Sequence, residues 1–301
     1  MNIDRRNFFK FAVAGIIALT DIAYEEVRMK QYARRIKNGR KEILADLHAH
    51  HSKDYPLEEQ LVAYSSGLNG ITSFLDLSYL SYQYFVRSNA YTTEISKGML
   101  ARVILDSNEE ESSLGYVVNT QEVEANPRFH ILAIGCLRRI QDHQDPRNIV
   151  EDIHRQYGVA ILNHPYVVPS GDWARYRLIN DEEHKVLEEL LGMVDEVEVN
   201  NGQCINLFYI DPYIWPISRV SMEKANRYAK KLIKGTRFNG TAASDMHNRL
   251  EQLRTSGIWI PREHLDTDGI EALKYYILNK DFERQDGLVS NVSFCRGHFK
   301  I

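Results

Sequence analysis

The feature that most constrains the fold is an alternation of short apolar runs with helical patterns from Glu42 onward. The β-type runs are expected to be strands at residues 43–47, 71–77, 102–105, 117–123, 131–134, 159–162, 196–199, 241–243 and 290–294. Helical spacing of apolar residues predicts helices at 57–66, 146–156, 181–191, 221–232 and 267–278. Strands that alternate with helices favour parallel pairing, and therefore a barrel or a doubly wound sheet.

Polar residues follow five of these expected strands at the point where each one ends. In an α/β barrel the carboxyl ends of the strands meet at one rim, where barrel enzymes build their sites. A single histidine at such a position means little, but five occupied strand ends indicate a shared site. The residues concerned are His48 and His50, Asp76, His164, Asn200 and Asn201, and Asp245 with His247.

The segment Asp46-Leu47-His48-Ala49-His50 is a candidate metal ligand. Residues two apart on a strand point to the same face, so His48 and His50 can hold one divalent cation together. Asp46 lies two residues before His48 and therefore points to the same face of the strand, where it is expected to orient an imidazole. The spacing recurs at the other end of the chain, where Asp245 and His247 combine a carboxylate with an imidazole.

Glu122 and His130 are expected to meet through a hairpin. Glu122 lies in a β-type run, and His130 opens the next one. Residues 124–129 contain Asn126-Pro127, which is typical of a turn. A carboxylate placed between two cations can bridge them, so Glu122 is the candidate bridging ligand.

These residues, taken in order, resemble the PHP (polymerase and histidinol phosphatase) superfamily over about residues 43 to 250. The resemblance implies an α/β fold with a distorted seven-stranded (β/α) barrel, and two or three divalent metal ions at its C-terminal rim. It also implies hydrolysis of a phosphoester. The matching positions are Asp46, His48, His50, Asp76, Glu122, His130, His164-Pro165, Glu198, Asn200, Ser244, Asp245 and His247.

Two departures from the family pattern concern the third metal. The family has Thr-Asp-His after the second strand, whereas this chain has Leu75-Asp76-Leu77, and leucine cannot bind a metal. The acidic residue after His-x-His falls unusually close, at Asp54, with His51 nearby. We therefore expect two bound metal ions and leave open whether a third is bound. Asp54 and Asp76 are further candidate ligands. The mixed ligand set accepts Zn, Mn or Fe.

The expected chemistry is attack on phosphorus by hydroxide formed between two cations, which lower the pKa of a bridging water. Asp245 and His247 are the candidate catalytic residues, and His247, His51 or a third metal would assist the leaving oxygen. Arg175, Arg249 and Asn200 are the candidate substrate-binding residues, with Arg177 a further candidate for binding phosphate. An aromatic loop is expected at 211–216, either over the site or against the core.

Two other functions remain open on these residues. The same metal chemistry would serve another bond, such as an amide or an acetyl group. A non-catalytic metal-binding protein attached to a membrane is the second alternative.

The charge distribution bears on partners. Residues 1–41 carry ten Lys/Arg against four Asp/Glu, although the whole chain has a net charge of −4. An acidic body does not suggest nucleic-acid binding, which needs a basic face, so a small-molecule phosphoester is the expected substrate. The three cysteines form no CxxC pair or disulfide framework.

The N-terminus resembles a twin-arginine export signal. Arg5-Arg6 precede two phenylalanines, Lys10 and a short apolar run in residues 1–20. No clear cleavage site follows, so the segment is expected either to be exported with the protein or to anchor it in the cytoplasmic membrane. Residues 21–41 are expected to form a charged linker helix, followed by a metallohydrolase domain over 42–301. The implied partner is the twin-arginine (Tat) export machinery.

Overall fold

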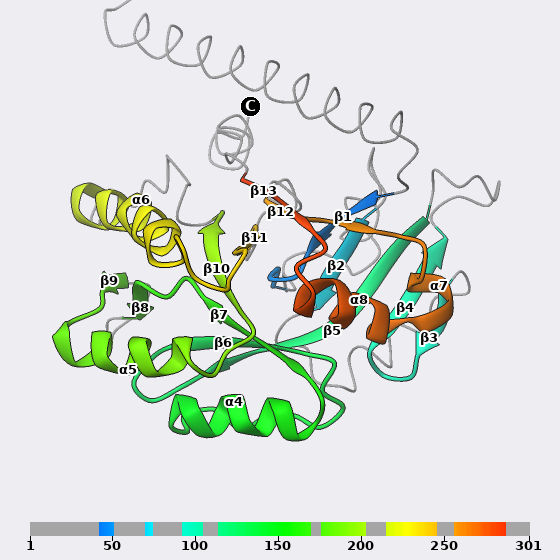
Figure 1. Cartoon of the computed structure of the whole chain (residues 1–301), viewed down its shortest axis with the longest axis horizontal. Coiled ribbons are helices and arrows are strands. Elements are labelled where there is room, and N and C mark those ends of the chain that lie inside the picture. The colour runs from blue at the N-terminus through cyan, green and yellow to red at the C-terminus, as the bar shows by residue number, and fades with distance from the viewer. Residues whose placement is uncertain are drawn as a thin grey trace, which may run out of the picture.

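The computed structural model describes residues 42–50, 70–74, 92–104, 114–169, 176–202, 215–245 and 256–286. These residues form a mixed α/β structure (Figure 1). The strands are β1 (Glu42–Asp46), β2 (Gly70–Phe74), β3 (Thr92–Ser96), β4 (Leu100–Ile104), β5 (Leu114–Glu124), β6 (His130–Ile134), β7 (Val159–Asn163), β8 (Val167–Pro169), β9 (Tyr176–Leu178), β10 (Glu196–Asn201), β11 (Thr241–Ala243), β12 (Gly257–Pro261) and β13 (Glu283–Gln285). The helices are α4 (Pro146–Arg155), α5 (Asp181–Leu191), α6 (Trp215–Leu232), α7 (Leu265–Asp268) and α8 (Ile270–Leu278).

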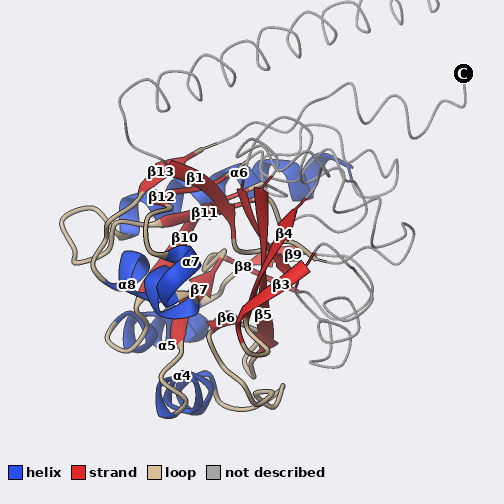
Figure 2. Ribbon diagram, turned by 90° about the vertical axis from the view of Figure 1, so that its right-hand side faces the viewer, coloured by secondary structure: helices blue, strands red, loops and turns tan. Residues whose placement is uncertain are grey.

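The main sheet runs in the order β11-β10-β7-β6-β5-β2-β1-β12-β13, with the β3–β4 pair attached to β5. Strands β1, β2 and β5 are parallel to one another, and so are β7, β10 and β11. Strand β6 lies antiparallel between β5 and β7, so these two groups point the same way. The carboxyl ends of all six parallel strands therefore share one edge, here called the rim. The strands bend round rather than lying flat (Figure 2).

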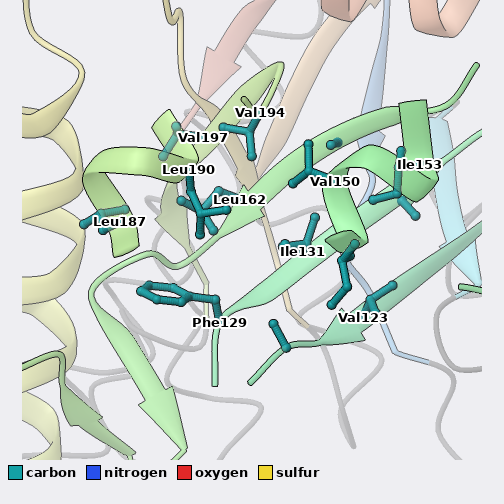
Figure 3. Packing of buried hydrophobic residues seen from close by; sticks show 14 of the residues in the cluster. Val123, Phe129, Ile131, Val150, Ile153, Leu162, Leu187, Leu190, Val194 and Val197 are labelled. Atoms are coloured by element: carbon teal, nitrogen blue, oxygen red, sulfur yellow. The ribbon is translucent and has the colours of Figure 1, made fainter. Parts of the chain in front are cut away.

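One face of the sheet packs against helices α4 and α5. Ile131 and Leu162 from the strands are buried against Val150 and Leu190 from the helices (Figure 3). Local sequence fixes where these helices begin. Asn180 caps α5 through a reciprocal pair of hydrogen bonds with Glu183, which satisfies two backbone N–H groups that the first turn would leave unpaired.

The opposite face packs against α8 away from the rim. Leu273 and Ile277 of α8 belong to one buried cluster with strand residues such as Ile43 and Ile258. A single helix was expected over 267–278, but the structure divides it into α7 and α8 at Gly269. Gly269 has a φ of 59°, and a side chain there would collide with Ser96 Oγ, which accepts a hydrogen bond from Ile270 N. The break therefore follows from tertiary contact rather than helical periodicity.

Two other expectations need correction. Within the described part of the chain, no backbone ladder joins β11 to β1 or β12, so the curled sheet is an open form of the expected seven-stranded barrel. The backbone of Trp215 and Pro216 begins helix α6 instead of ending an aromatic loop. Strands β3, β8, β9, β12 and β13 were not expected from the sequence.

Several expected segments lie outside the described residues: the export signal, the linker helix, the helix at 57–66 and the strand at 290–294. Among the helices that are described, none is both long enough and apolar enough to span a membrane.

Candidate metal centre

The rim gathers six of the predicted ligands, five of which lie at the ends of parallel strands. His48 and His50 follow β1, His164 follows β7, Asp245 follows β11, and Glu122 lies near the end of β5. His130 joins them from the opposite chain direction. It is the first residue of antiparallel β6, so its strand begins at the edge where its neighbours end.

Glu122 lies at the centre of the cluster. Its Oε1 is 2.9 Å from His130 Nδ1, 3.1 Å from His48 Nε2 and 3.4 Å from His164 Nε2. Its Oε2 is 3.2 Å from His50 Nε2. The prediction that a hairpin brings Glu122 and His130 together is confirmed, and the two carboxylate oxygens face different sets of imidazoles.

Asp245 completes the group around the His-x-His segment. Its Oδ1 is 3.3 Å from His48 Nε2 and 3.2 Å from His50 Nε2. Two sets of donor atoms are thus close enough to hold a cation: His48 with His50 and Asp245, and His48 with Glu122 and His164. Because His48 contributes to both sets and Glu122 faces both, the sets are adjacent.

Hydrogen bonds on the far side of two rings decide which nitrogen faces the cluster. His48 Nδ1 is 3.0 Å from Glu198 Oε1, and His164 Nδ1 is 3.2 Å from the carbonyl oxygen of Val167. Each Nδ1 therefore carries a proton and donates it, which leaves Nε2 as the ring nitrogen that faces Glu122. Asp46 was expected to orient an imidazole, but Glu198 holds His48, and Asp46 Oδ1 accepts a hydrogen bond from Ser244 N.

Two asparagine amides reach the carboxylates; Asn201 was named only as a polar strand end, without a role, and Asn163 was not among the expected site residues. Asn163 Nδ2 donates to Glu122 Oε1 at 3.1 Å. Asn201 Nδ2 donates to both Glu198 Oε2 and Asp245 Oδ2, each at 3.0 Å. Their position at the ends of β7 and β10 was the available signal in the sequence, since strand ends had already located the histidines.

Asn200, the expected substrate-binding residue, has a different environment. Its side chain is buried, with Nδ2 donating to Ser256 Oγ and Oδ1 accepting from Lys230 Nζ, both at 3.2 Å. The cause is a shift of register in β10 between Glu198 and Asn200, where the pairing passes from Thr241 directly to Ala242. Such a bulge reverses the alternation of faces, so Asn201 takes the face of Glu198 and Asn200 takes the other.

The electrostatics of the cluster are set by carboxylates in a buried space. Burial lowers the pKa of His48, but Asp245, Glu122 and Glu198 together raise it well above its ordinary value. Burial likewise lowers the pKa of His164, but Glu122, Asp245 and Glu198 together raise it above its ordinary value. Burial raises the pKa of Glu122, yet His130 and His48 hold it well below the usual carboxyl range. Glu122 is therefore ionised and favours positive charge beside it.

These residues fit a divalent-cation site. His48 Nε2 and His130 Nε2 are buried, and neither has a hydrogen-bond partner among the described residues. A buried polar atom without a partner is costly, and so is the crowding of several carboxylates in a buried space. A cation held by imidazole nitrogens and carboxylate oxygens would remove both costs.

The backbone is strained at two of the site residues. His164 has a φ of 24° and Asp245 a φ of 50°. Residues other than glycine rarely adopt positive φ, and such outliers concentrate at functional sites because the surrounding structure must hold them there. Asp245 is held by its own N–H, which donates to the carbonyl oxygen of His48 at 2.7 Å.

The remaining expected site residues are Asp54, Asp76, His247, Arg175 and Arg249, and all of them lie outside the described part of the chain. Their assigned roles stay predictions. The same is true of His51, while Arg177 is described only as part of strand β9.

No family model and no curated protein matches the sequence. Solved structures do match. The lesion-specific endonuclease PfuEndoQ from Pyrococcus furiosus is 14% identical with a TM-score of 0.47, over 81% of this chain and 57% of that one. A complex of Endonuclease Q with a 27-mer duplex carrying an abasic lesion is 12% identical with a TM-score of 0.48, over 81% and 58%. PsfC from Pseudomonas syringae is 11% identical with a TM-score of 0.44, over 73% and 82%. The chain thus spans less than two thirds of the endonuclease chains, and at these low similarities the chemistry of the site is inferred from its own residues.

Proposed function

We propose that this protein is a metal-dependent hydrolase that cleaves phosphate esters. The observation that carries the proposal is the position of Glu122, whose Oε1 faces His130 and His164 while its Oε2 faces His50. A carboxylate placed between two sets of imidazoles suits a pair of divalent ions. The order of ligands along the chain, which resembles that of the PHP superfamily, supports the same proposal.

Each ligand would have a distinct role. His48, His50 and Asp245 would hold one cation and His130 and His164 the other, with Glu122 shared between them. Glu198 would keep His48 in the tautomer whose Nε2 faces the cation. Bound divalent cations would act as Lewis acids on phosphoryl oxygens and would lower the pKa of a coordinated water.

The surrounding chain would keep the ligands in place during turnover. The N–H of His164 donates to Glu198 Oε2 at 3.0 Å, so the strand end after β7 is tied to the carboxylate of β10. Preorganised ligands lower the cost of reorganisation as charge develops in the transition state. Strand ends tied together by such hydrogen bonds would therefore set the geometry of the reaction.

The proposed substrate is a small-molecule phosphoester, because the charge of the body does not favour a polyanion. We also propose that the N-terminal segment directs the protein to the twin-arginine export machinery.

The test of function is elemental analysis of protein purified without chelator, paired with a panel of substrates. The panel would hold phosphomonoesters, small phosphodiesters, a DNA duplex, and acetylated sugars or amides. Bound metal with turnover of a phosphoester would support the proposal. Turnover of acetylated sugars or amides alone would overturn it in favour of another metallohydrolase, and bound metal without any turnover would point to a non-catalytic metal protein.

A further inference from the structure

The bulge in β10 places a neutral amide between two carboxylates of the site. Asn201 is fully buried, and its Nδ2 donates one hydrogen bond to Glu198 Oε2 and a second to Asp245 Oδ2. The two acceptors come from different strands, β10 and the end of β11. A single NH₂ group therefore links the two carboxylates.

These two carboxylates act on opposite sides of His48. Glu198 Oε1 holds the Nδ1 side of the ring at 3.0 Å, and Asp245 Oδ1 lies 3.3 Å from Nε2. In each carboxylate, Asn201 contacts the oxygen that does not face His48. Together with the bond from His164 N to Glu198 Oε2, its hydrogen bonds restrain the rotation of both carboxylates and leave the other oxygens directed at the imidazole.

The donor is also uncharged, which matters for cation binding. A lysine or arginine in this place would neutralise a carboxylate and repel a divalent ion at short range. An amide supplies two N–H donors without positive charge, so the negative potential at the site is kept.

The backbone of Asn201 is itself anchored. Asn226 of helix α6 accepts a hydrogen bond from Asn201 N at 3.2 Å and donates one to Asn201 O at 3.1 Å. The side chain of Asn226 is buried, so these bonds are shielded from water. Helix α6 thereby holds the bulged end of β10 in the position from which the amide reaches both carboxylates.

We propose that Asn201 is a positioning residue that sets the metal affinity of the site by orienting Glu198 and Asp245. This inference rests on the proposed metal-dependent function. Residues that orient metal ligands typically change affinity by about 10–100-fold when they are replaced.

The test is titration of metal-free full-length protein with Zn²⁺ in competition with a chromophoric chelator. Asn201→Ala is expected to weaken Zn²⁺ binding by about 10–100-fold relative to the wild type. The matched control is Asn200→Ala, which removes the neighbouring buried amide on the opposite face of the same strand. Asn200→Ala should lower the melting temperature, because Ser256 and Lys230 lose a partner, but should leave Zn²⁺ affinity within about twofold of the wild type.

A second variant keeps the proposal testable if Asn201→Ala does not fold. Asn226→Ala leaves the side chain of Asn201 intact and removes the two bonds to its backbone, so Zn²⁺ binding should weaken in the same direction by a smaller factor. If Asn201→Ala binds Zn²⁺ as tightly as the wild type does, the proposed role of Asn201 is overturned. If only Asn226→Ala folds, wild-type Zn²⁺ affinity in that variant overturns the role in the same way. Absence of Zn²⁺ and Mn²⁺ binding by the wild type would instead overturn the proposed function.

Discussion

The backbone N–H of Asp245 donates a hydrogen bond to the carbonyl oxygen of His48 at 2.7 Å. A second bond runs beside it, from Ser244 N to Asp46 Oδ1 at 3.1 Å. Together they connect the end of β11 to the end of β1, where the described sheet has no ladder between these strands. Two hydrogen bonds thus join these strand ends at the rim, next to the candidate metal ligands.

Asp245→Asn should disable the proposed site. The substitution keeps the size of the side chain but removes the charge that faces His48 and His50. We expect metal content to fall and phosphoesterase activity to drop by more than about 100-fold, which exceeds the effect of residues that only orient ligands. His50→Ala should act in the same direction. Elemental analysis and steady-state kinetics would measure both effects, and full activity in both variants would exclude the site.

The control for that experiment is Asp181→Asn. Asp181 is exposed in the first turn of α5, on a helix that packs against the same face of the sheet as α4. Its replacement should leave metal content and activity unchanged.

Glu122→Gln should lower the number of metal ions bound per chain by about one. A carboxylate can bridge two cations with two anionic oxygens, whereas glutamine offers one neutral acceptor. The stoichiometry can be measured by elemental analysis after equilibration with Mn²⁺ and removal of free metal. The control is Glu151→Gln on the exposed side of α4, and an unchanged stoichiometry in Glu122→Gln would rule out a bridging role.

The stability of the metal-free protein should depend on pH through the cluster. The pKa of His48 in the folded chain lies well above 6.5, because three carboxylates outweigh burial. Between the pKa of the unfolded chain and that of the folded chain, the ring binds fewer protons in the unfolded state. The stabilisation from His48 is therefore fully present below the unfolded pKa, and it is lost as pH rises through the folded pKa. The melting temperature of chelator-treated protein should therefore fall as pH rises above the ordinary histidine range.

Glu122 should contribute the opposite dependence at acidic pH. Its pKa lies well below the ordinary carboxyl value, so its contribution is present above that value and lost as pH falls. Saturating Zn²⁺ should abolish the decline at high pH, because metal binds the deprotonated rings. Thermal melts with chelator and with Zn²⁺ across the pH range provide the measurement, and identical profiles would contradict the expectation.

Leu190→Ala should destabilise the fold without affecting metal binding at saturation. Leu190 is fully buried between α5 and the sheet (Figure 3). Removal of a large buried side chain typically costs about 2–5 kcal/mol in the free energy of unfolding. Denaturant unfolding would measure the loss, and Leu278→Ala, at an exposed position of α8, should cost far less.

Much of the site could be anticipated because its residues follow strands that the sequence indicates clearly. The apolar runs before His48, His164 and Asp245 are buried strands in the structure, and parallel strands necessarily end at a common edge. The turn at Asn126-Pro127 likewise predicted the meeting of Glu122 with His130.

The sequence could not reveal which polar residue at the end of β10 enters the site. Asn200 matched the PHP pattern and lies two residues after Glu198, so regular alternation would place both on one face. The bulge arises from the pairing of β10 with β11 and is not a property of β10 alone. It exchanges the faces of Asn200 and Asn201, so only the tertiary structure identifies Asn201 as the residue between the carboxylates.

By itself, the sequence determined the alternation of strands and helices, the rim at which polar strand ends gather, and the imidazole and carboxylate donors available there. Periodicity and residue chemistry are local properties, so they can be read without coordinates. The tertiary structure decided the open sheet, the break at Gly269, the tautomers set by Glu198 and Val167, and the place of Asn201. Each of these depends on a contact between segments far apart in the chain, which no local pattern encodes.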